Sequence, residues 1–185
     1  MAEYKGVMIY GEVTEGKLAA ITAELLGCGR KLADDLGQEL YAVLVGSAIS
    51  GPVQEAIAFG ADKVYVVDDP LLKDYQTDSY VLTLEKIAKQ VMPQILILGQ
   101  TSIGRDLAPR LAFRLETAAS MDCVELAIDP DSKLMLQTRP VYGGNALAIF
   151  TGETFPQIAT VRAKAMSPLE RDTSRQGEII TIEAG

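Results

Sequence analysis

Four short, uninterrupted apolar runs alternate with segments of helical periodicity in the first part of the chain. The runs cover residues 7–10, 41–45, 64–67 and 95–98. Strands without polar alternation are typical of parallel sheets that are covered on both faces. A helix between each strand and the next makes βαβ units, whose crossovers are right-handed. The pattern therefore predicts an α/β fold with a doubly wound, mostly parallel sheet.

The segments between these runs carry the helical signal. In the first of them, one apolar face is marked at helical spacing by Leu18, Ile21, Leu25, Cys28, Leu32 and Leu36. Gly37 follows this face and is expected to end the helix, because glycine adopts the left-handed conformation of a helix end without strain. Further helices are predicted over residues 53–59, 81–91 and 107–115.

The pattern changes in the second part of the chain. Strand-like runs at residues 124–128, 134–138, 146–150 and 158–161 are joined only by short segments rich in turn formers. Glycine, asparagine and aspartate favour such turns, since they tolerate backbone conformations that other residues avoid. We therefore expect the parallel sheet to be followed by a C-terminal antiparallel extension.

The chain length and its last residues predict the domain organisation. A length of 185 residues suits one well-buried domain. Residues 166–185 carry proline, serine and several charges and resemble an outgoing linker. We expect an α/β domain over residues 1–165 and a linker over residues 166–185 that leads towards a further domain.

Net charge and apolar content restrict the kinds of partner that we expect. The formal net charge of −8 argues against a surface built for nucleic acid or anionic lipid. No apolar run approaches the roughly 18 residues that a membrane span needs, and the N-terminus carries no secretory signal. We expect no nucleic-acid partner, no membrane insertion and a cytoplasmic location.

Histidine is absent and cysteine is rare, which removes much catalytic chemistry. Without histidine, neither a Ser-His-Asp nor a Cys-His arrangement can form. Cys28 and Cys123 form no C-x-x-C pair, so no zinc site or dithiol motif is visible. The sequence predicts no metal site and no catalytic constellation, and hence not an enzyme.

A glycine-rich loop follows the fourth apolar run and precedes a helix. Its backbone N–H groups could hold a phosphate or adenine nucleotide at the carboxyl edge of the sheet. The candidate residues are Gly99, Thr101, Ser102, Gly104 and Arg105. The loop matches neither a Walker A motif nor G-x-G-x-x-G.

A plain connection remains the alternative for this loop. In that interpretation Asp106 caps the helix and Pro109 falls at its third position, where the missing N–H costs nothing. The Asp106 carboxylate would then occupy the donors that a phosphate needs.

A second unusual string, Arg139-Pro-Val-Tyr142-Gly-Gly-Asn145, places a cation and a phenol at a tight turn. Such groups suit contact with another protein or a planar ligand. Arg162, after the last strand-like run, is expected near them. We take Arg139, Tyr142, Asn145 and Arg162 as candidate interface residues. The alternative is an ordinary hairpin with a solvated arginine and a half-buried tyrosine.

These strings resemble the α subunit of electron transfer flavoproteins, including its nitrogen-fixation and carnitine-pathway relatives. The segment from Thr101 to Ala112 resembles the signature of that family after the fourth strand. Further matching strings fall in the family's order and at about its spacing: Asp122-Cys123, Arg139 to Asn145, and Ala159 to Arg162. The resemblance covers the whole chain.

The resemblance implies a fold and a role. The fold would be an adenine nucleotide α-hydrolase-like α/β domain. The family forms an αβ heterodimer that carries FAD and moves electrons from dehydrogenases, such as acyl-CoA dehydrogenases, to a quinone oxidoreductase or another acceptor. This chain would be the amino-terminal domain of the α subunit, which packs against the β subunit as a scaffold.

The resemblance also places the cofactor. In the family, FAD lies mainly in a carboxyl-terminal domain with a Gly-x-Ser-Gly loop and a Gln-His pair, and this sequence contains neither. FAD is therefore expected in the parent complex, held mainly outside this chain. A truncated domain and a natural short homologue both remain open. A free-standing adenine-nucleotide-binding module that uses the loop of residues 99–105 is the alternative function.

Overall fold

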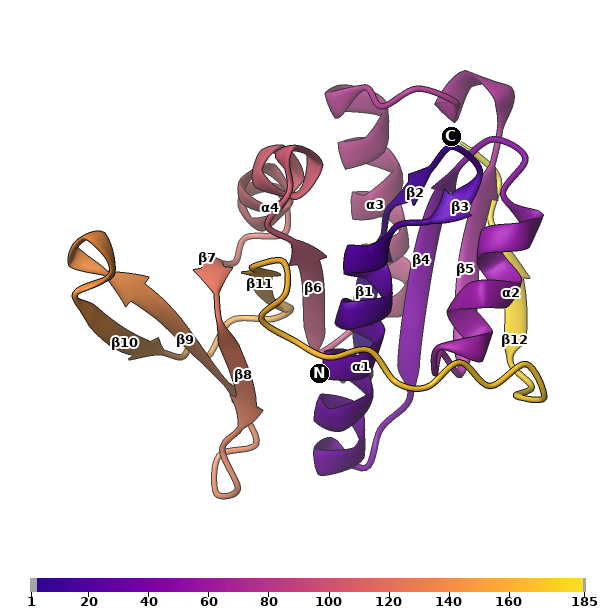
Figure 1. Ribbon diagram of the computed structural model, residues 1–185. Coiled ribbons are helices and arrows are strands. Elements are labelled where there is room, and N and C mark those ends of the chain that lie inside the picture. The colour runs from indigo at the N-terminus through magenta and orange to yellow at the C-terminus, as the bar shows by residue number, and fades with distance from the viewer. Residues whose placement is uncertain (1–2, 185) are drawn as a thin grey trace.

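The structure, a computed structural model, describes residues 3–184 and is built around a seven-stranded parallel sheet (Figure 1). The strand order is β12-β5-β4-β1-β6-β11-β7. The strands of this sheet are β1 Val7–Gly11, β4 Leu40–Gly46, β5 Lys63–Asp68, β6 Ile95–Gly99, β7 Ala119–Cys123, β11 Gln157–Val161 and β12 Glu178–Thr181. The helices are α1 Ala20–Leu36, α2 Ser50–Ala58, α3 Thr77–Val91 and α4 Ser102–Arg114, with short 3-10 turns η1 Pro70–Leu72 and η2 Tyr142–Gly144.

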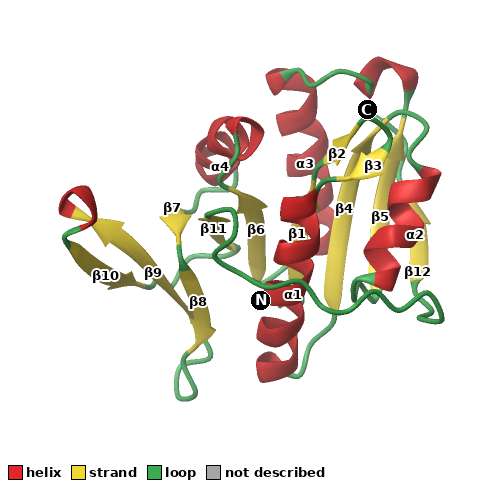
Figure 2. Cartoon of the chain, in the orientation of Figure 1, coloured by secondary structure: helices red, strands yellow, loops and turns green. Residues whose placement is uncertain are grey.

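Two helices cover each face of the sheet (Figure 2). Helices α1 and α2 pack on one face, where Leu25 and Val53 join a buried apolar cluster. Helices α3 and α4 pack on the other, where Leu84 and Leu107 join a second cluster. All five residues of β1 are buried, as expected for a central parallel strand. The predicted α/β, doubly wound fold is confirmed.

Helix ends follow the local sequence. Gly37 ends α1 in the left-handed conformation, with φ 64° and ψ 36°, and its N–H donates to the last turn of the helix. This is the helix stop that the sequence predicts. Helix α3 begins at Thr77 and is one turn longer at its start than the apolar periodicity indicates.

The second part of the chain divides between two sheets. Strands β8 Glu125–Ile128, β9 Met135–Val141 and β10 Ala146–Phe150 form an antiparallel sheet of three strands, in the order β10-β9-β8. Figure 1 shows this sheet standing apart from the parallel sheet, beyond its β7 edge. We call it the arm. The fourth predicted antiparallel strand, residues 158–161, instead lies in β11, between β6 and β7. The antiparallel extension is therefore inserted before β11 rather than placed at the C-terminus.

The segment after β11 crosses the layer of α1 and α2 to reach the opposite edge of the parallel sheet (Figure 1). Arg171 pairs with Glu55 of α2, and Arg175 pairs with Asp62 at 3.1 Å. The sequence predicts only a linker over residues 166–185, whereas Glu178–Thr181 form β12, which pairs in parallel with β5.

A small hairpin of β2 Val13–Thr14 and β3 Lys17–Leu18 follows β1 at the carboxyl edge. Its residues separate β1 from the start of α1. Across residues 3–184, no helix combines the length and the apolar character needed to cross a bilayer.

Candidate functional site

The loop after β6 is closed by its own side chains. Thr101 is the N-cap of α4, and its hydroxyl oxygen accepts the N–H of Gly104 at 3.0 Å. The prediction that Asp106 caps the helix is therefore wrong, because α4 begins four residues earlier. Pro109 consequently lies inside the helix rather than in its first turn. One of the N–H donors that a phosphate would use is already occupied.

Asp106 has a different role, at the contact between α4 and the start of α3. Its carboxylate accepts the hydroxyl groups of Thr77 and Tyr75, each at 2.6 Å. Arg110, one turn further on, donates to the same carboxylate at 3.1 Å. The hydrogen bond from Thr77, then those from Tyr75 and Arg110, lower the pKa of Asp106. Asp106 thus fixes helix packing and does not face a ligand at the loop.

A buried carboxylate lies beside the loop at the point where the strand order reverses. Glu12 directly follows β1, and β6 is the neighbour of β1 in the sheet. The side chain is only 7% exposed. Its Oε1 accepts the hydroxyl of Thr101 at 2.8 Å, and its Oε2 has no hydrogen-bond partner among the described residues. Open α/β sheets bind their ligands at this position, and a carboxylate here repels a phosphate.

Burial raises the pKa of Glu12, which predicts a pH-dependent stability. A raised native pKa stabilises the fold below the unfolded pKa, and this contribution is lost as the pH rises through the native pKa. The glutamine side chain of the Glu12→Gln variant cannot ionise. We expect the melting temperature of the variant, relative to the original chain, to rise between about pH 4 and pH 8. Glu170→Gln, at an exposed position, is the control. A pH-independent difference at Glu12 would contradict the prediction.

The second predicted motif lines a cavity of about 550 Å³ at the carboxyl edge of β7 and β11. The cavity is lined by Asp122, Arg162 and the whole turn from Arg139 to Gly144. Arg162 forms a two-point ion pair with Asp122, from Nε at 3.0 Å and from a terminal nitrogen at 2.7 Å. The expected proximity of Arg162 to the turn is thus present in the structure.

Positively charged residues from both predicted motifs act on the carboxylate of Asp122. The hydrogen bonds from Arg162 lower the pKa of Asp122, and the charges of Arg139 and Arg105 lower it further. Arg105 comes from the first turn of α4, so the segment after β6 contributes a positive charge here. Sequence reasoning missed this role of Asp122, because only spatial proximity shows it.

Tyr142 and Asn145 have different surroundings. Tyr142 is 84% exposed, and its backbone is left-handed with φ 51°. Asn145 donates from its side-chain amide to the carbonyl of Tyr142 at 3.0 Å, so it stabilises the turn. Of the four candidate interface residues, Arg139, Tyr142 and Arg162 line the cavity, and Asn145 supports the turn.

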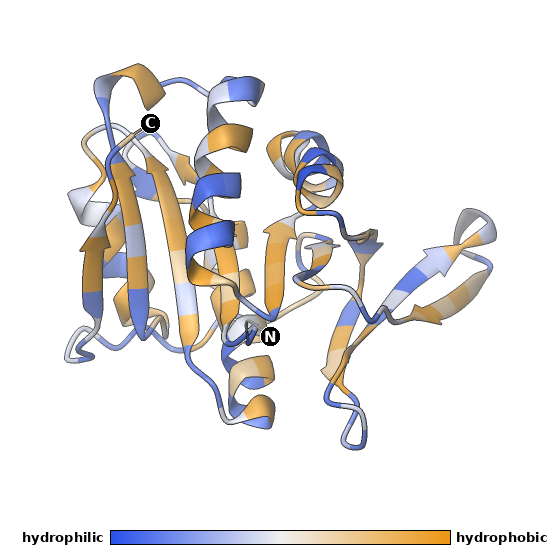
Figure 3. Ribbon diagram, turned by 180° about the vertical axis from the view of Figure 1, so that it is seen from behind, coloured by the Kyte–Doolittle hydropathy of each residue, from blue (hydrophilic) through white to orange (hydrophobic). Residues whose placement is uncertain are grey.

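The arm exposes apolar side chains on the face that is turned away from the core. Met135 and Gln137 of β9 are buried on its inner face. Alternation places Pro140, Leu147 and Ile149 on the outer face, where Leu147 faces Pro140 across the ladder. Leu147 and Ile149 are 65% and 68% exposed. Figure 3 shows the apolar character of β10. An antiparallel sheet with one solvated face normally carries polar residues there, so this outer face is unusual.

The fold and this site define a doubly wound α/β domain with an inserted antiparallel arm. The electron transfer flavoprotein domain family matches residues 7–185, and the chain belongs to this family. It is 44% identical over 185 residues to an electron transfer flavoprotein subunit alpha from Thermoanaerobacterium thermosaccharolyticum, covering all of this chain and 56% of the relative. It is 43% identical over 185 residues to the subunit alpha from Megasphaera elsdenii, covering all of this chain and 55% of the relative.

A further relative matches to a similar extent. The protein FixB of Azorhizobium caulinodans is 42% identical over 186 residues, which cover 98% of this chain and 50% of the relative. The resemblance read from the sequence motifs is confirmed. The chain spans about half the length of the curated relatives that it matches.

Proposed function

We propose that this chain is the amino-terminal scaffold and subunit-interface domain of an electron transfer flavoprotein α subunit, and that its arm docks on the β subunit. The apolar outer face of the arm carries the proposal. Leu147 and Ile149 are too exposed to contribute to this chain's own core, and exposed apolar patches mark interaction sites. The exposed Tyr142 at the tip of the same arm is a residue type that often anchors interfaces.

The cofactor of the parent complex is proposed to be FAD, held mainly by a further part of the α subunit. The loop after β6 does not fit the pyrophosphate of FAD. The buried carboxylate of Glu12 lies against Thr101, and Thr101 already accepts the N–H of Gly104. The same arrangement disfavours the alternative of a free-standing adenine-nucleotide module at residues 99–105.

The complete αβ complex would carry electrons from a dehydrogenase, such as an acyl-CoA dehydrogenase, to a quinone oxidoreductase or another acceptor. In this proposal the chain itself performs no catalysis and acts in the cytoplasm. Its contribution is to hold the two subunits in a fixed relation, so that the flavin bound elsewhere meets its electron partners in one geometry.

Tyr142→Ala tests the interface. The substitution removes an exposed aromatic side chain at the tip of the arm, so we expect the affinity for the β subunit to fall by at least about tenfold. Isothermal titration calorimetry of the chain with the β subunit of the same organism measures it. Phe113→Ala is the matched control, because Phe113 on α4 is 85% exposed and lies off the arm. Equal affinities for Tyr142→Ala and the original chain would remove Tyr142 from the interface.

A further inference from the structure

Arg139 stands out among the arginines of the site because its Nε is buried without a partner. It forms no ion pair within the described residues 3–184, and its buried Nε has no hydrogen-bond partner. Arg162, in contrast, is satisfied by Asp122. A buried N–H without an acceptor costs free energy in the isolated chain, and the cost is larger for a charged group. The arrangement is therefore incomplete by one acceptor.

The position of Arg139 lets an acceptor from outside the chain reach its guanidinium. Arg139 shares the inner face of β9 with Met135 and Gln137, which are both buried. It nevertheless borders the cavity of about 550 Å³ together with Tyr142. An acceptor can therefore reach the guanidinium through this cavity without unfolding the arm.

The β9–β10 hairpin of the arm cannot supply that acceptor from its own sequence, and Glu125 of β8 lies opposite Thr138, on the other face from Arg139. Residues 132–152 contain no aspartate or glutamate, although the chain has 25 acidic residues against 17 basic ones. At the cavity, the guanidinium groups of Arg139 and Arg162 border the carboxylate of Asp122, and the charge of Arg105 also acts on that carboxylate. The cavity therefore gathers more positive than negative charge on a molecule whose net charge is negative.

We infer that the cavity beside Arg139 receives a carboxylate side chain of the β subunit, which pairs with the Arg139 guanidinium while Tyr142 packs over the contact. The inference rests on the proposed function and specifies its chemistry. A planar guanidinium binds a carboxylate through two parallel hydrogen bonds. The apolar outer face of the same arm, with Leu147 and Ile149, favours a protein surface over a small free anion, since a small anion would leave that face exposed.

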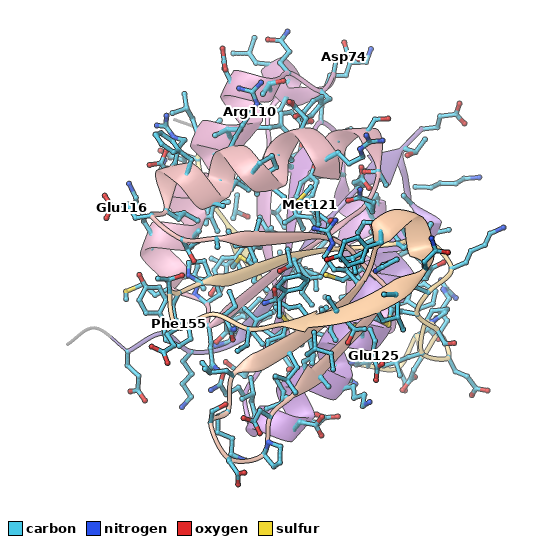
Figure 4. All side chains as sticks on the ribbon, turned by 90° about the vertical axis from the view of Figure 1, so that its left-hand side faces the viewer. Asp74, Arg110, Glu116, Met121, Glu125 and Phe155 are labelled. Carbon is cyan, nitrogen blue, oxygen red and sulfur yellow. The ribbon has the colours of Figure 1, made fainter. Side chains whose placement is uncertain are left out.

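Arg139→Gln is the test, with affinity for the β subunit as the readout. Removing one partner of a buried ion pair leaves the other charge unpaired. We expect the dissociation constant to rise on the order of 30-fold or more, and its dependence on NaCl to weaken. Arg139→Lys keeps the charge but not the two-point geometry, and we expect an intermediate affinity. Arg110→Gln is the control, because Arg110 lies on α4 away from the three-stranded sheet (Figure 4).

A labelling experiment on the unmodified chain avoids any folding defect of the variants. Phenylglyoxal modifies accessible arginines, and mass spectrometry measures each position. We expect the β subunit to protect Arg139 and to leave Arg110 reactive.

The outcomes separate the inference from the proposed function. Unchanged affinity of Arg139→Gln, with Arg139 still reactive in the complex, would overturn the inference while leaving the subunit role intact. An original chain that does not bind the β subunit would overturn both. Micromolar binding of inorganic phosphate or AMP that Arg139→Gln abolishes, without any effect on β-subunit binding, would overturn the inference in favour of a small-anion site.

Discussion

Gly104→Ala is expected to destabilise this domain severely. A Cβ atom at this position would lie 1.7 Å from the carbonyl oxygen of Gly99 and 2.9 Å from its carbonyl carbon. These are backbone atoms at the end of a central strand, so no side-chain rotation relieves the overlap. Forcing extra volume into a packed site commonly costs 1–3 kcal/mol. We expect about 3 kcal/mol or more here, a large part of the typical stability of a domain.

Gly51→Ala is the matched control for this prediction. Gly51 occupies the first turn of α2, as Gly104 does in α4, and both helices follow a strand of the parallel sheet. Apart from its two chain neighbours, a Cβ at Gly51 meets nothing within 4 Å. Gly51→Ala should therefore change stability by no more than about 1 kcal/mol in either direction, because alanine favours a helix but Pro52 restricts the residue before it. Urea denaturation of both variants gives the comparison. If Gly104→Ala unfolds at the same urea concentration as Gly51→Ala, the tight packing of α4 on β6 does not exist.

The comparison of Gly104→Ala with Gly51→Ala also tests whether Gly104 serves folding or ligand binding. A glycine that cradles phosphate is required for ligand binding and is neutral for folding without ligand. Gly104 is expected to matter for folding itself, because it lets the start of α4 approach the end of β6.

The parallel half of the fold could be predicted because its signals are local. The apolar runs at residues 7–10, 41–45, 64–67 and 95–98 all became β-strands of the central sheet. Strand pairing is not local, which is why β11 was misplaced. Its apolar run was visible, but nothing in the sequence says that it inserts between β6 and β7.

The edge strand β12 was missed for a different reason. Ile179, Ile180 and Ile182 form a short β-branched run there, but the side chains of this edge strand are mostly exposed and add little to a core. Backbone pairing to β5 and the crossing segment that leads to it position this strand instead. Charged and proline-containing residues in that crossing made the whole region resemble a linker.

The two sequence motifs of the candidate site could be predicted, but the contacts that their residues make with distant parts of the chain could not. Glu12 and Thr101 are 89 residues apart, and Arg162 and Asp122 are 40 apart. Glycine, threonine and arginine in a loop indicate anion binding only if nothing else occupies the position. The Glu12 carboxylate, which no local pattern distinguishes from an exposed one, disfavours an anion there.

The position of the arm depends on one buried amide side chain. Gln157, the first residue of β11, is 2% exposed. Its Oε1 accepts the N–H of Met135 at 2.7 Å, and its Nε2 donates to the carbonyls of Met135 at 3.2 Å and Gly152 at 3.0 Å. Met135 begins β9, so these bonds connect the arm to the parallel sheet much as a backbone ladder would.

Gln157→Ala is expected to destabilise the domain by about 2–4 kcal/mol and to loosen the arm selectively. The substitution leaves the buried N–H of Met135 and the carbonyl of Gly152 without this partner, while the carbonyl of Met135 keeps the hydroxyl of Thr151 at 3.1 Å, and it opens a cavity. Urea denaturation measures the stability. Hydrogen exchange should show faster exchange in β9 and β10 than in the original chain, with β4 unchanged.

Gln54→Ala is the control, because Gln54 is exposed on α2 and should change stability by no more than about 0.5 kcal/mol. If the proposed function is correct, Gln157→Ala should also weaken binding of the β subunit, although Gln157 is buried and touches no partner. Loss of affinity together with loss of arm protection would mean that a rigid arm is required for docking. Lost affinity with full protection of β9 and β10 would contradict that coupling.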